Sequence, residues 1–195
     1  MKDENEMIVS LSNYTTFFSI ATRSLSQVKL LTRERDLRAK KSETTGNDVE
    51  FICEKNAEIQ RSAMVTVIFS VATIESYINE YGIQNFSRSY FNNYLDKLDI
   101  KSKWVIYPKL VTGKQIDTSS KTFESLEKLI SLRNRLVHDK TRKKRICDLN
   151  ESDWVTELEA EEAVNTVLGL VKELAGLDKD IEIHWLNEAE SDRFA

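Results

Sequence analysis

The chain contains very few residues that interrupt a helix. Its 195 residues include one proline and five glycines, whereas strand-rich proteins need many of both residue types at their frequent turns. Apolar residues also recur every three or four positions over long stretches, which is the spacing of one face of an α-helix. The sequence therefore predicts an all-α protein, built as an antiparallel bundle of amphipathic helices.

The apolar spacing predicts helices at 10–41, 48–81, 86–98, around Pro108, at 118–139 and at 156–174. Gly82 is the expected stop of the second helix, because glycine readily adopts the backbone conformation that ends helices. Thr156 and Glu159 have the spacing of a capping box at the start of the last helix. The segment 181–185 is predicted to be a short extended piece. We find no internal repeat, so a single domain over 1–195 is predicted.

Composition and cysteine usage exclude several classes of protein. The longest mostly apolar run, 63–74, is too short to span a bilayer and is predicted to be a buried core helix. No basic segment followed by an apolar one opens the chain, so no signal peptide is expected. Cys53 and Cys147 are far apart and lack clustered histidines, so neither a disulfide framework nor a zinc site is expected. We expect a cytoplasmic protein with no metal, no other cofactor and no membrane partner.

One predicted helix, 118–139, places a cation, an amide and an imidazole within two turns. Arg133 takes a position in its apolar stripe where a leucine would be expected. An arginine in such a position needs an acidic partner, a wet cleft or a route to solvent, and Glu75 is a candidate partner. Asn134 lies one turn before His138 on the same face. Spacing alone favours a simpler interpretation, in which these cations complement the C-terminal end of the helix dipole.

The order Arg133-Asn134-x-x-x-His138, late on a helix, resembles the signature of HEPN domains. In that family an arginine, usually followed by a polar residue, precedes a histidine by four to six residues. The segment 62–79 is similar to the long central helix of prokaryotic members, and 104–114 is similar to the connection that enters the motif helix. The resemblance covers roughly 50–174, which we take as the core, with an N-terminal helix in 1–46 and a C-terminal tail in 176–195.

The resemblance implies an all-α bundle that commonly forms homodimers with the motif helices facing each other. Many relatives are metal-independent endoribonucleases of toxin–antitoxin and antiviral defence systems, and others are inactive RNA-binding or scaffolding modules. The resemblance therefore implies RNA as the substrate. It also allows an antitoxin or another defence protein as a partner. One branch carries a tyrosine two residues after the histidine, where a partner nucleotidyltransferase modifies it. Lys140 takes that position here, so such a partner is not expected.

The chemistry of metal-free RNA cleavage suits these residue types. The ribose 2′-OH attacks the adjacent phosphate and leaves a 2′,3′-cyclic end, which requires a base, an acid and positive charge at the phosphorane. Histidine can act in either proton-transfer role, and a guanidinium can hold two phosphate oxygens. One chain supplies one histidine here, so we expect a two-fold dimer to combine Arg133 and His138 from both subunits. Asn134 would orient His138 or contact the phosphate.

Positive charge continues directly after the motif. The candidate RNA-binding residues are Arg135, Lys140, Arg142, Lys143, Lys144 and Arg145. Such a local cluster can hold a phosphate backbone, although the net charge of −4 argues against nucleic-acid binding by the whole surface. The alternative is a solvated loop that pairs with the acidic segment following it.

Other candidate residues and functions remain open. His184 lies between Ile183 and Trp185 and is predicted to be structural. Five aromatic residues could stack on bases or belong to the core, namely Tyr77, Tyr81, Tyr90, Phe91 and Tyr94. The three functions considered are an endoribonuclease, a catalytically silent RNA-binding or dimerisation module, and an interaction protein in which Arg133 closes a buried polar network. We favour the endoribonuclease.

Overall fold

The computed structural model describes residues 13–40, 46–138, 154–181 and 183–186. Within these residues the protein is all-α and contains no strand, as predicted. In chain order the elements are α1 (Tyr14–Ala39), α2 (Gly46–Asn85), α3 (Arg88–Tyr90), η1 (Phe91–Leu95), α4 (Ile100–Thr112), α5 (Lys121–Val137) and α6 (Glu157–Leu177).

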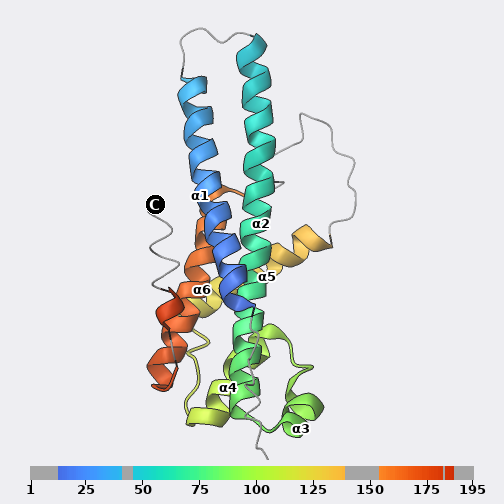
Figure 1. Cartoon of the computed structure of the whole chain (residues 1–195), viewed down its shortest axis with the longest axis vertical. Coiled ribbons are helices and arrows are strands. Elements are labelled where there is room, and N and C mark those ends of the chain that lie inside the picture. The colour runs from blue at the N-terminus through green and yellow to red at the C-terminus, as the bar shows by residue number, and fades with distance from the viewer. Residues whose placement is uncertain (1–12, 41–45, 139–153, 182, 187–195) are drawn as a thin grey trace, which may run out of the picture.

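Two long antiparallel helices, α1 and α2, form the axis of the molecule (Figure 1). Helix α6 packs against both of them, α4 packs on α2, and α5 contacts α2 and α6. The end of α1 and the start of α2 extend together past the top of α6 in this view. Helix α5 crosses behind α2, and its C-terminal end projects sideways from the bundle. The last turns of α5 are therefore the most protruding part of the motif helix.

The hydrophobic core draws on the whole described chain. Trp104 of α4 and Phe18 of α1 are 0% and 1% exposed. The ring of Trp104 stacks on Tyr77 of α2 with centroids 6.3 Å apart, and Trp185 meets Phe18 edge-on at 5.4 Å. Helix α1 and the segment after α6 thus contribute to the core, in addition to residues 50–174.

The predicted core helix is the middle of α2. Ala63, Val67, Val71 and Ile74 are each at most 2% exposed. By length and composition alone α2 would be able to cross a membrane, but half of its most apolar window is buried inside the bundle. Buried core helices pass the same test, so the burial supports the predicted role.

Side-chain caps begin α5 and α6. The Ser120 hydroxyl accepts from the N–H of Phe123 at 3.2 Å. The Thr156 hydroxyl accepts from the N–H of Glu159, and the Glu159 carboxylate accepts from the N–H of Thr156 at 2.8 Å, which confirms the predicted capping box. These bonds satisfy N–H groups that have no partner within the helix, so both helices begin close to the predicted positions.

Two predicted segments are wrong in type. The single helix expected at 86–98 is a one-turn α3 followed by the π-helical turn η1. Phe91 and Leu95, four positions apart on one face of this turn, both enter the core, where they are 5% and 4% exposed. The extended piece expected at 181–185 instead enters a helical turn at 184–186, because Trp185 and Leu186 are both drawn into the core.

Gly82 does not stop α2, which continues to Asn85. A Cβ atom at this position would lie 2.7 Å from ring carbons of both Phe91 and Tyr107. Two aromatic rings therefore pack directly on the backbone of α2, and this close approach explains the glycine better than a helix end does.

Replacing Gly82 with alanine is expected to lower the free energy of unfolding by about 1–3 kcal/mol, because two packed rings must move. The control is Gly176→Ala in α6, where the new Cβ meets nothing within 4 Å. Alanine favours the helix, so this variant should be unchanged or more stable by at most about 1 kcal/mol. Urea unfolding monitored by circular dichroism measures both, and equal destabilisation would contradict the close-packing explanation.

Candidate functional site

The apolar stripe of α5 leaves the core toward its C-terminal end. The C-terminal end of the helix projects from the bundle (Figure 1), and side-chain burial decreases toward that end. Three residues of the stripe are buried, namely Phe123, Leu126 and Leu129. Three later ones are partly buried, namely Ile130, Leu132 and Leu136, and Val137 is 53% exposed. The last two turns of α5 thus present apolar side chains that the rest of the described chain covers only in part.

Arg133 lies in the middle of this stripe, as predicted. Successive residues of a helix are rotated by about 100°, which places Arg133 roughly 20° from the buried Leu126. Its side chain is partly buried, and within the described residues it has neither an ion pair nor a hydrogen bond. Glu75, considered as a candidate partner, instead lines a hollow with Asn13 and Phe17 next to α1. The guanidinium therefore keeps its donors available for a ligand or a second chain.

His138 ends α5, and its imidazole is exposed. Its backbone N–H donates to the carbonyl oxygen of Asn134 at 3.0 Å and closes the last turn. The Asn134 side chain, one turn earlier, is also exposed. The amide and the imidazole thus lie on one face, as their spacing predicts.

Within one chain, Arg133 and His138 do not face each other. Five helical residues correspond to a rotation of about 140°, so the guanidinium follows the apolar stripe and the imidazole follows the polar face. The two groups of a single chain therefore do not converge on one small phosphate group. This separation requires a second contributor if the two residue types act together.

Arg135 turns toward α6, away from Arg133. Its Nη2 lies 3.7 Å from Oε1 of Glu159. The two residues line a surface groove of about 410 Å³ together with Lys128 and Ser131. An acid beside Arg135 weakens the positive potential there, so this position is less suited to RNA binding than its charge alone suggests.

The remaining predicted RNA contacts lie outside the described residues. These are Lys140, Arg142, Lys143, Lys144 and Arg145, and Cys147 lies there too. Their role stays a prediction. Of the other residues considered, His184 is exposed beside the buried Trp185, and Cys53 is an exposed free cysteine.

The five aromatic residues considered for base stacking fall into two groups. Tyr77, Tyr81 and Phe91 are at most 6% exposed and belong to the core. Burial raises the pKa of both Tyr77 and Tyr81 above its ordinary value. Tyr90 and Tyr94 are 43% and 69% exposed, with ring centroids 5.4 Å apart. Of the five, these two alone have a ring surface open to a ligand.

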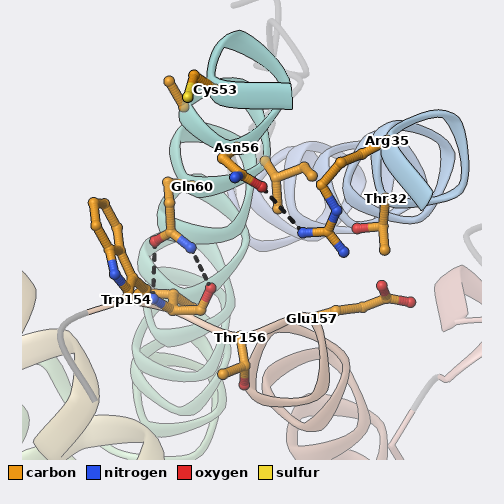
Figure 2. Close-up of a pocket in the computed structure, with 11 residues that line it drawn as sticks. Thr32, Arg35, Cys53, Asn56, Gln60, Trp154, Thr156 and Glu157 are labelled. Carbon is orange, nitrogen blue, oxygen red and sulfur yellow. Dashed lines mark hydrogen bonds between the residues drawn. The ribbon is translucent and has the colours of Figure 1, made fainter. Parts of the chain in front are cut away.

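Sequence reasoning missed a pocket between α1, α2 and the start of α6 (Figure 2). Its volume is about 650 Å³, and Arg35, Gln60, Trp154 and Glu157 are among its lining residues. The lining residues come from three separate segments of the chain. No local spacing could have revealed them, because helix packing alone brings these segments together.

The described residues contain no group of His, Cys, Asp and Glu side chains that could hold a metal ion. Comparisons with protein-family models, with curated proteins and with solved structures find no match to this chain. What the protein does therefore rests on the chemistry of the α5 end and of the pocket.

Proposed function

We propose that this protein is a homodimeric, metal-independent endoribonuclease of the HEPN type, acting in a toxin–antitoxin or antiviral defence system. One observation carries the proposal. Arg133 is partly buried, has no partner within the described residues, and lies on an apolar stripe that leaves the bundle just before an exposed histidine. An arginine that closed a buried polar network would be expected to have an acidic partner at this position.

The apolar stripe at the C-terminal end of α5 is suited to packing against the α5 of a second protomer. The exposed Val137 and the partly buried Leu136 would lose contact with water on dimerisation, which is favourable at about 25 cal/mol per Å² of apolar area. A two-fold axis brings identical patches together. The proposed dimer would thereby place Arg133 of one protomer toward His138 of its partner, and would overcome their separation within one chain.

The proposed reaction needs only these groups. One His138 imidazole, unprotonated, takes the proton of the ribose 2′-OH as the 2′ oxygen attacks the phosphorus. The bond from phosphorus to the 5′ oxygen breaks, and the second, protonated His138 gives its proton to that oxygen. The products are a 2′,3′-cyclic phosphate and a 5′-OH. The two Arg133 guanidinium groups stabilise the negative charge of the phosphorane, and Asn134 orients an imidazole or contacts the phosphate.

The test is incubation of the purified full chain with mixed single-stranded RNA in the presence of EDTA. We expect cleavage with 2′,3′-cyclic phosphate and 5′-OH ends, and a dimer by light scattering. Salt-dependent retention of RNA without cleavage would contradict the endoribonuclease and favour a silent RNA-binding module. If the protein neither cleaves nor retains RNA, the endoribonuclease and the RNA-binding module are both contradicted.

Replacing Arg133 with leucine is expected to lower the cleavage rate about 10²- to 10³-fold, because charge stabilisation at the phosphorane is lost. The fold and the dimer should persist, since leucine continues the apolar stripe. The matched control is Lys128→Leu on the same helix, whose ammonium pairs with Glu124. Its cleavage rate at saturating RNA should stay within a few-fold of wild type, and an equal loss in both variants would contradict the assigned role of Arg133.

A further inference from the structure

A pocket opens where α1, α2 and the first residues of α6 meet, and α5 contributes no residue to its lining (Figure 2). One wall is held by two hydrogen bonds. The Gln60 Nε2 donates to the carbonyl oxygen of Val155 at 2.8 Å, and the N–H of Val155 donates to the Gln60 Oε1 at 2.9 Å. Because Gln60 both donates and accepts, the start of α6 is fixed against α2, and the pocket exists before any ligand binds.

Arg35 of α1 supplies a positive charge to this pocket. Its Nε donates to Oδ1 of Asp36 at 2.9 Å, and its Nη1 donates to Oδ1 of Asn56 at 3.1 Å. These partners hold the planar guanidinium in one orientation. A guanidinium has more N–H groups than these bonds use, so further donors remain for a ligand.

Glu157 of α6 supplies a negative charge to the same pocket. It is the first residue of α6, is partly buried, and has no ion pair within the described residues. In Figure 2 its carboxylate lies on the same side of the pocket as the guanidinium of Arg35. The two opposite charges line one cavity but do not form an ion pair with each other. Arg35 forms its ion pair with Asp36.

The pocket has one further polar group, a hydroxyl, that lacks a hydrogen-bond partner within the described residues. It belongs to Thr32, one helical turn before Arg35, and is buried. Buried hydroxyl groups are normally hydrogen-bonded, because leaving one unpaired is unfavourable. Because the Oγ1 of Thr32 is covered by neighbouring atoms, the side chain must rotate before a ligand oxygen can accept from it.

The rest of the lining is mostly apolar. Ile59 and Ala57 belong to α2, and the indole of Trp154, which is 47% exposed, lies across Gln60 from Arg35 in Figure 2. The volume of about 650 Å³ falls within the usual range of small-molecule sites, which combine mostly apolar walls with a few converging polar groups.

We propose that this pocket binds a free α-amino acid with a large apolar or aromatic side chain. The carboxylate of the ligand accepts from Arg35 and Thr32, its ammonium donates to Glu157, and its side chain lies toward Ile59 and Trp154. A zwitterion matches both charges of the pocket. A simple anion would face the carboxylate of Glu157 without compensation. A simple cation would pair with Glu157 but leave unused the Arg35 donors that Asp36 and Asn56 do not take.

Matched probes separate these charge classes in isothermal titration calorimetry of the full chain. L-Phenylalanine, L-leucine, L-methionine and L-tryptophan are the test ligands, and we expect at least one to bind saturably with one site per chain. For L-phenylalanine, the two analogues are 3-phenylpropanoate, which lacks the ammonium, and 2-phenylethylamine, which lacks the carboxylate. Each should bind about tenfold or more weakly than the amino acid. If none of the four amino acids binds, or if either analogue binds as tightly as L-phenylalanine, the proposal is wrong.

Two variants assign the charges to residues. Arg35→Gln should lower the affinity for the best-binding amino acid at least about tenfold and leave that for its decarboxylated amine unchanged. Glu157→Gln should likewise lower the affinity for the amino acid at least about tenfold, but leave the affinity for the deaminated acid, which lacks the ammonium, unchanged. Arg33→Gln, an exposed residue of α1, is the control and should bind as wild type does. Thermal unfolding shows whether each variant is folded. Glu157 is at the start of a helix, so Glu157→Gln still tests the proposal if Arg35→Gln does not fold. Equal affinity in Glu157→Gln and wild type would overturn the proposal.

This site is independent of the proposed RNA cleavage. Since no α5 residue lines the pocket, Arg133→Leu should bind the amino acid as wild type does. Failure of one proposal therefore leaves the other standing.

Discussion

RNA cleavage is expected to fall by about 10²- to 10⁴-fold when His138 is replaced with alanine, because both proton transfers lose their carrier. The imidazole is exposed, and the helix closes through the backbone N–H of this residue, which alanine retains. The fold should therefore persist, with a loss of at most about 1 kcal/mol from the missing interaction with the helix dipole. Cleavage is measured under single-turnover conditions with EDTA, and light scattering reports the dimer.

The chain offers a matched control for this variant. His184 is the second of its two histidines and is also exposed, so His184→Ala should cleave RNA at the wild-type rate. RNA affinity of His138→Ala should stay near that of wild type, because the proton carrier is not needed for binding. Wild-type cleavage by His138→Ala would exclude the assigned role, and so would an equal loss in His184→Ala.

Replacing Trp104 with alanine is expected to lower the free energy of unfolding by about 3–5 kcal/mol. The indole is 0% exposed and stacks on Tyr77 with an interplanar angle of 20°, which joins α4 to α2. Its Nε1 is buried without a hydrogen-bond partner in the described part of the chain, so removing it relieves a small unfavourable contribution. The cavity left by the ring outweighs that gain, because the surrounding helices cannot fully close it.

Trp154 provides the comparison of equal residue type. It is 47% exposed, so Trp154→Ala should cost no more than about 1 kcal/mol. A further variant, Trp104→Phe, should cost less than Trp104→Ala, because phenylalanine fills part of the space and carries no N–H group. Urea unfolding measures all three, and equal destabilisation of Trp104→Ala and Trp154→Ala would contradict the assigned packing.

The helices could be predicted where local signals decide them. The capping box of Thr156 and Glu159, the start of α5 and the buried middle of α2 follow from side chains close in sequence. Gly82 was mistaken for a helix end, because its role depends on the ring of Tyr107, which lies 25 positions later. The π-turn of η1 departs from the regular helical period on which the prediction of one helix at 86–98 depends.

The candidate site was predictable only in part. Spacing identified Arg133 as a member of the apolar stripe, and the structure bears out this position. Spacing did not show that Glu75 lies elsewhere, or that Arg135 lies beside Glu159. Both results depend on how α2 and α6 pack around α5, and such packing has no local signature.

The sequence by itself determined the all-α class, the starts of α5 and α6, and the order of an arginine, an amide and an imidazole on α5. These follow from periodicity and caps, which act over a few residues. Only the tertiary structure decided which stretch of α5 leaves the core, and that Thr32, Arg35 and Glu157 line one cavity. The physical reason is that burial and charge convergence arise between helices distant in sequence, where packing sets the distances.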